Sequence, residues 1–98
     1  MTRHEALRRL GRNREKLRAF GVRHIAVFGS TARDQAGPGS DVDLLVEFEP
    51  AARVGLFAFV RLQRFLSDVM GTRIDLATPA ALRPEMRDTI LAEAVRAF

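Results

Sequence analysis

The stretch GSTARDQAGPGSDVDLLVEF, residues 29 to 48, decides how this chain is interpreted. It begins with the pair Gly29 and Ser30, directly after an apolar run, and Asp41 and Asp43 lead into a second apolar run. A helix that starts at the Gly-Ser pair would attract phosphate groups. Two carboxylates spaced as Asp-x-Asp on a strand point to the same face. The stretch therefore predicts phosphate chemistry.

The surrounding patterns predict alternating helices and strands in one compact domain spanning residues 1–98. Apolar residues make up 47% of the chain, which is enough for a core. The expected strands span residues 22–28, 41–48 and 73–77. The first expected helix is opened by a capping box at Thr2 and Glu5 and ends at Gly21. A short helix from Ser30, a helix over 53–70 capped by Gly71 and a last helix from Pro84 complete the set.

A helix between the strands over 41–48 and 73–77 makes these strands parallel neighbours. Asp75 should then lie beside Asp41 and Asp43 on one open face. Three such carboxylates repel each other, and a divalent cation removes the conflict. Mg²⁺, or Mn²⁺ in its place, prefers carboxylate and phosphate oxygens. We therefore predict that Asp41, Asp43 and Asp75 are both the catalytic residues and the metal ligands, holding ions about 4 Å apart that activate a hydroxyl and stabilise a leaving phosphate oxygen.

The nucleotide phosphates are expected at the Gly-Ser turn. Gly29 lets the chain approach a ligand closely, and Ser30 offers a hydroxyl and a backbone N–H. Arg33 could reach either a phosphate or a local carboxylate such as that of Asp34. Ser40 completes the set of candidate nucleotide-binding residues, which is Gly29, Ser30, Arg33 and Ser40.

Several protein classes are disfavoured by composition. The chain has no Cys, so disulfides and thiolate metal sites are excluded. No stretch predicts a membrane span or a signal peptide, and a cytoplasmic location is the simplest expectation. Residues 1–24 carry a charge of +6. No aromatic residues interleave with these arginines, so we interpret them as a solvated helix face and expect no direct contact with nucleic acid.

Two helices offer apolar surfaces. The helix over 53–70 is apolar around much of its circumference, so it either lies under the sheet or presents a second face to a partner. The aromatic residues Phe57, Phe59 and Phe65 are expected mainly in the core. The contacts expected for the last helix are Met86, Ile90, Leu91, Val95 and Phe98.

The motif from Gly29 to Arg33, followed by Ser40 to Val46, resembles the minimal nucleotidyltransferases of the DNA polymerase β superfamily. It is most similar to the MntA-type antitoxins that are paired with HEPN-domain toxins. The resemblance covers nearly the whole chain. It implies a polymerase-β-like α/β (α+β) fold with a small mixed sheet of three strands or slightly more, flanked by helices. One departure is Asp34, where many relatives have Gly, and this puts the shape of the loop in question.

The resemblance implies a metal-dependent enzyme with ATP as substrate. It would transfer AMP to a tyrosine of a HEPN-domain RNase toxin, with which it would form a hetero-oligomer. The Gly-Ser pair would contact the phosphates, and the three Asp residues would bind metal. The chain itself has no Tyr.

Two other functions stay open from the sequence. The chain could neutralise a toxin by binding alone, through the apolar helix over 53–70 or the last helix. It could instead modify a small-molecule alcohol, although the lack of a second domain argues against this.

Overall fold

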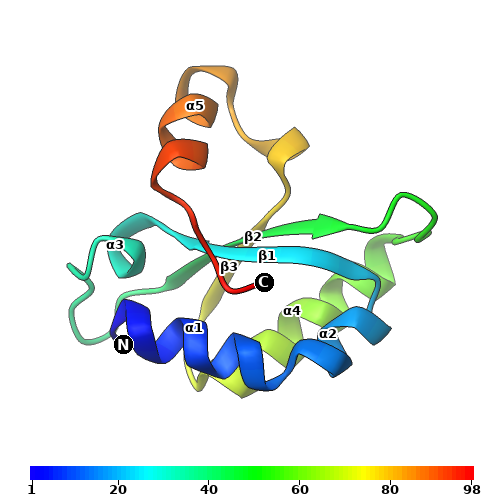
Figure 1. Cartoon of the computed structure of the whole chain (residues 1–98), viewed down its shortest axis with the longest axis horizontal. Helices are drawn as coiled ribbons and strands as arrows, with labels where there is room; N and C mark the ends of the chain where they lie inside the picture. Colours follow the sequence, from blue (N-terminus) through cyan, green and yellow to red (C-terminus); the bar gives the residue numbers. More distant parts are fainter.

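The computed structural model describes all residues from 1 to 98 and shows a four-stranded mixed sheet with strand order β3-β2-β1-β4. The strands are β1 (Val22–Phe28), β2 (Val42–Phe48), β3 (Ile74–Ala77) and β4 (Val95–Arg96). The helices are α1 (Arg3–Arg12), α2 (Arg14–Ala19), α3 (Gly29–Ala32), α4 (Leu56–Met70), the 3₁₀ helix η1 (Pro79–Ala81) and α5 (Pro84–Glu93). Figure 1 shows α1, α2 and α4 on one side of the sheet and α5 on the other.

The predicted parallel pairing is confirmed. Strand β3 runs parallel to β2 after the crossover through α4, and the register places Asp43 opposite Asp75. Strand β1 is antiparallel to both β2 and β4. The sheet is therefore mixed, and the start of β2 lies beside β3 on one side and beside the end of β1 on the other.

The main core lies between the sheet and the helices α1, α2 and α4. Alternate residues of β1 and β2 point into it, including Ile25, Val27 and Leu44, which are fully buried. Helix α4 contributes Leu62 and Leu66. This agrees with the alternating pattern of the two strands, since every second side chain faces the same layer.

The opposite face of the sheet carries a smaller apolar cluster. Ile90 of α5 packs there against Ala26, Phe28 and Leu45. Ile90 is the one buried residue of α5. The predicted burial of both faces of β1 is therefore confirmed, and α5 is attached to the sheet mainly through a single side chain.

The end of the chain differs from the prediction. Val95 belongs to β4, a strand that the sequence analysis does not predict, and Phe98 follows it beneath Arg14 and Arg18. Met86 and Leu91 are 49% and 45% exposed, so their predicted role as packing contacts is wrong. The free edge of β1 recruits the last residues into the sheet, where Ile25 N–H donates to the Phe98 carbonyl.

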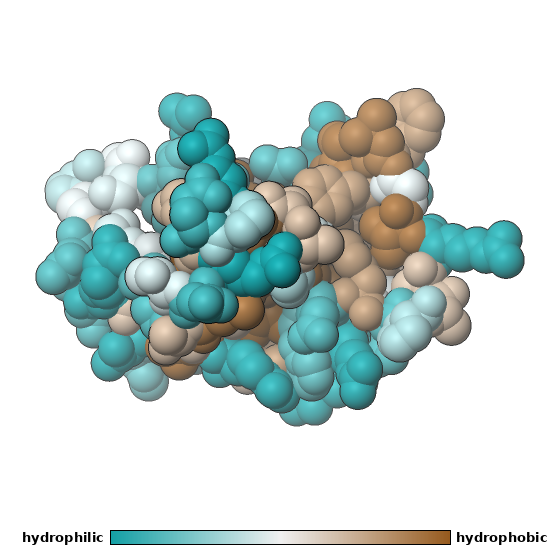
Figure 2. Space-filling model, turned by 90° about the horizontal axis from the view of Figure 1, so that it is seen from above, coloured by the Kyte–Doolittle hydropathy of each residue, from teal (hydrophilic) through white to brown (hydrophobic).

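The expected cap of helix α4 and its expected position under the sheet are confirmed. Its buried residues lie under the sheet, and Gly71 caps it in the left-handed conformation at φ 68°. It begins at Leu56 rather than Arg53. At its first turns, Leu56, Phe57 and Val60 are exposed, so the expected core position of Phe57 is wrong. Seen from above the sheet, hydrophobic groups are exposed towards one end of the molecule (Figure 2).

The predicted first helix is divided in two at Asn13, whose side chain donates to the Arg9 carbonyl. Its predicted start is confirmed, because Glu5 N–H donates to the Thr2 hydroxyl. None of the helices has the length and apolarity needed to cross a bilayer.

Candidate functional site

The three predicted acidic residues gather at the start of β2 and on β3. Asp43 and Asp75 are direct neighbours across the parallel strands. Asp41 precedes β2 and is exposed, as is Asp75, whereas Asp43 is half-buried. A hollow of about 340 Å³ at this edge of the sheet is lined by Asp41 and Asp75 together with Gln63, Ser67, Arg73 and Ile74.

The acids influence each other electrostatically. Burial raises the pKa of the Asp43 carboxyl above its usual range, and the charges of Asp75 and Asp41 raise it further. The guanidinium of Arg33 acts in the opposite direction. Burial and the neighbouring carboxylates outweigh Arg33, so the pKa of Asp43 remains raised.

The donor set fits a divalent cation by its chemistry. Carboxylate oxygens are the ligands that Mg²⁺ prefers, and a bound cation would relieve the repulsion around Asp43. The side chains are not already arranged as a cluster of three ligands. Asp41 instead faces Arg73, with Oδ1 3.8 Å from Nε, and Arg73 is 88% exposed. Such an exposed pair is weak, so Asp41 is free to turn towards Asp43.

Gly29 lies directly against Asp43. Its φ of +70° falls in the left-handed region, and a Cβ added there would lie 3.1 Å from the Asp43 Cγ and closer still to Oδ2. No other residue type fits without moving the carboxylate. The end of β1 therefore brings the Gly-Ser turn into contact with the acidic residues, and Ser30 follows half-buried in the first turn of α3.

Glu93 at the end of α5 is a site residue that the sequence analysis missed. Its Oε1 accepts a hydrogen bond from Gly29 N–H at 3.0 Å, and its Oε2 lies 2.9 Å from Arg33 Nη1. Its charge also contributes to the raised pKa of Asp43. A single Glu at the end of a polar helix carries no signal in the sequence that would reveal these contacts.

Arg33 does pair with a carboxylate, but the partner is Glu93 and not Asp34. Arg33 contacts Glu93 and Gln35, whereas Asp34 accepts a hydrogen bond from Arg3 N–H at 2.8 Å. Asp34 has a φ of 55°. The loop thus keeps a conformation that favours glycine, which Asp tolerates better than most residues.

Ser40 lies apart from the acidic residues. Its hydroxyl accepts a hydrogen bond from Gly37 N–H at 3.2 Å, which closes the loop between α3 and β2. It lines a separate hollow with Glu5 and Arg9 of α1. The structure does not bring Ser40 to the Gly-Ser turn, and its nucleotide-binding role stays a prediction.

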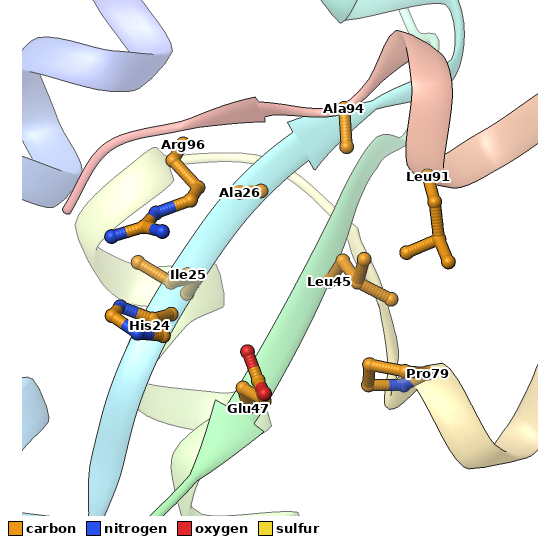
Figure 3. A pocket seen from close by; sticks show the side chains of 9 residues that line it. All are labelled: His24, Ile25, Ala26, Leu45, Glu47, Pro79, Leu91, Ala94 and Arg96. Atoms are coloured by element: carbon orange, nitrogen blue, oxygen red, sulfur yellow. The ribbon is translucent and has the colours of Figure 1, made fainter.

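Another hollow, of about 330 Å³, lies further along the open face of β1 and β2. Figure 3 shows its lining residues, with Leu45 in the floor, Leu91 and Pro79 at the side of α5 and η1, and His24 and Glu47 at the far end. None of the predicted site residues lines it. The candidate site is therefore the cluster at the start of β2.

A family model described as a nucleotidyltransferase domain matches residues 8–97. The chain belongs to this nucleotidyltransferase family. Membership makes it a transferase enzyme, and the mixed sheet flanked by helices is the polymerase-β-like fold of the minimal nucleotidyltransferases.

Relatives of the nucleotidyltransferase are found among archaeal proteins. The protein adenylyltransferase MntA of Thermococcus cleftensis is 42% identical over 76 residues, which are 78% of this chain and 75% of that protein. A candidate protein adenylyltransferase of Methanocaldococcus jannaschii is 40% identical over 75 residues, 76% of this chain and 78% of that protein.

Solved structures agree with the fold of the nucleotidyltransferase. A candidate minimal nucleotidyltransferase superposes with a TM-score of 0.80 at 33% identity and covers 97% of this chain and 95% of that chain. A toxin–antitoxin complex with AMP-PNP contains a chain with a TM-score of 0.66 at 17% identity, covering 88% of this chain and 73% of that one. The second likeness concerns the fold alone.

Proposed function

We propose that this nucleotidyltransferase is an antitoxin that transfers AMP from ATP to a tyrosine of a HEPN-domain RNase toxin. Two observations on relatives support the proposal. The relative from T. cleftensis is named a protein adenylyltransferase, and the complex with AMP-PNP is a toxin–antitoxin pair. This chain has no Tyr, so the acceptor must come from another protein.

The observation that carries the proposal is the contact between the two halves of the motif. Asp43 lies beside Asp75 across the parallel strands, and Gly29 lies against Asp43. A triphosphate held at Gly29, Ser30 and Arg33 would then have its α-phosphate next to the carboxylates. The strands lie in the order β3, β2, β1 across the sheet. This order would place the acceptor near β3, the α-phosphate near β2 and the leaving pyrophosphate near β1, in the line that phosphoryl transfer requires.

We assign the steps of the transfer to residues of this chain. The acceptor hydroxyl oxygen bonds to the α-phosphorus of ATP, the bond from that phosphorus to the bridging oxygen breaks, and pyrophosphate leaves. Asp75 would receive the hydroxyl proton. Arg33 stabilises the charge on the departing pyrophosphate. Asp41, Asp43 and Asp75 would hold Mg²⁺, which when bound offsets negative charge on the phosphate oxygens.

Transfer to a partner tests the proposal. The chain is incubated with Mg-ATP and the protein encoded beside it, and the intact mass of that protein is measured. We expect a gain of one or more adenylyl units, located on tyrosine by fragmentation. A neighbour that gains no adenylyl unit from ATP, while the chain remains folded, would count against the proposal.

The metal ligands are tested in the same assay. Asp41→Asn combined with Asp43→Asn should lower transfer by at least about a hundredfold, because electrostatic stabilisation of the reacting phosphate is lost. Asp68→Asn changes an exposed carboxylate on α4 and serves as the matched control. Unchanged transfer in the double variant would remove these residues from the mechanism.

A second function, neutralisation by binding alone, is favoured by one observation. Leu56 and Phe57 at the start of α4 are 74% and 80% exposed, which is unusual for adjacent large apolar residues. In this case the double Asp variant would still protect cells from the toxin, whereas Phe57→Ser would not. Loss of protection in the double Asp variant would exclude binding alone.

A further inference from the structure

We propose that Glu93 competes with the nucleotide for the phosphate-binding groups of the site, so that its carboxylate must release them before ATP binds. This inference rests on the proposed function. It starts from the contacts of Glu93, since the carboxylate accepts from Gly29 N–H at 3.0 Å and pairs with Arg33 Nη1 at 2.9 Å.

These two groups are the donors that the proposed function assigns to phosphate oxygens. A backbone N–H carries one proton, so Gly29 cannot donate well to Glu93 and to a phosphate at once. Arg33 has further donors but only one positive charge to share. A carboxylate and a triphosphate at the same position also repel each other. Glu93 thus occupies the place of a phosphate oxygen in the free protein.

The attachment of α5 allows such an exchange. Ile90 is the only buried residue of the helix, and it packs against Ala26, Phe28 and Leu45 at the sheet. The Glu93 side chain is 23% exposed and lies at the end of α5, separated from the strand β4 by Ala94 alone. A rotation of the Glu93 side chain, or a small shift of α5, would free Gly29 N–H without unfolding the main core on the other face of the sheet.

Glu93→Gln removes the negative charge and keeps the size of the side chain. We expect this variant to bind ATP about tenfold more tightly than the wild type in a calorimetric titration with Mg-ATP, because a hydrogen bond to a charged group no longer has to be broken. Asp88→Asn removes one charge from an exposed position of the same helix and is the matched control. It should leave the affinity for ATP unchanged.

The contact itself is tested without nucleotide. In the free protein, the amide resonance of Gly29 should shift on Glu93→Gln and stay in place on Asp88→Asn. If it does not shift, the hydrogen bond is absent in solution and the competition is overturned. If the wild type binds ATP and Glu93→Gln binds it equally or more weakly, Glu93 supports the turn and the competition is again overturned.

The same ATP titrations also distinguish a failure of the proposed function from a failure of the competition by Glu93. Binding of ATP by the wild type together with tighter binding by Glu93→Gln supports both proposals. Failure of the wild type and of both variants to bind ATP overturns the proposed function, and with it the competition, even where the Gly29 resonance shows the contact. Melting temperatures of the three proteins verify that each is folded.

Discussion

At the scale of single residues, Gly29 connects the two halves of the site. We expect Gly29→Ala to lower the free energy of unfolding by roughly 1–2 kcal/mol, because an L-residue is strained at φ +70°. The new Cβ would also push the Asp43 carboxylate aside, so transfer should fall as well. Urea unfolding measures the first effect and the intact mass of the partner the second.

Gly37→Ala is the control for this substitution. Gly37 lies in the loop before β2, and a Cβ added there meets nothing within 4 Å. It should change stability by less than about 0.5 kcal/mol. Equal stabilities of the two variants would contradict the left-handed conformation of Gly29.

Asp43 is expected to reduce stability at neutral pH. Its pKa is raised by burial and by the charges of Asp75 and Asp41, so the folded protein binds this proton more tightly than the unfolded chain does. Folding is therefore favoured at low pH, and stability falls as the pH rises from the ordinary carboxyl pKa through the raised one.

Asp43→Asn should remove this part of the pH dependence. At pH 7 we expect a melting temperature higher by roughly 2–4 °C, corresponding to about 0.5 kcal/mol after allowance for screening by solvent. Transfer should be lost in the same variant, which is the usual conflict between stability and activity at a catalytic residue. A lower melting temperature at pH 7 would contradict the sign of the effect.

At the scale of elements, α4 has two kinds of aromatic position. Phe65 packs against Phe20 with ring centroids 5.3 Å apart, whereas Phe57 is 80% exposed. Phe65→Ala should therefore cost about 2 kcal/mol, below the range for fully buried Phe, and Phe57→Ala less than about 0.5 kcal/mol. Chemical unfolding of both variants measures the difference, and similar losses would contradict the orientation of α4.

The elements could largely be predicted from local patterns. The strands predicted over 22–28 and 41–48 and the glycine that ends α4 depend on neighbours in sequence. These elements are confirmed, with the second strand beginning one residue later, at Val42. The strand β4 could not be predicted, because two residues become a strand only by pairing with the edge of β1. The exposure of Met86 and Leu91 has the same origin, since it depends on how far α5 stands from the sheet.

At the scale of the whole molecule, the neighbouring acids could be predicted because the crossover rule fixes β2 and β3 as parallel. That rule predicts that Asp43 and Asp75 are neighbours, and the strand register confirms it. Glu93 could not be predicted in the same way. It reaches Gly29 only because the chain returns through η1 and α5 over the open face of the sheet (Figure 1).

We propose that Asp41, Asp43 and Asp75 together hold a divalent cation in front of the Gly-Ser turn. Titration with Mn²⁺, followed by electron paramagnetic resonance in the presence of a non-hydrolysable ATP analogue, tests this claim. We predict that the wild type binds Mn²⁺ and that Asp41→Asn with Asp43→Asn weakens this binding by about tenfold or more. Absence of Mn²⁺ binding by the folded wild type, or equal binding by the double variant, would contradict the claim.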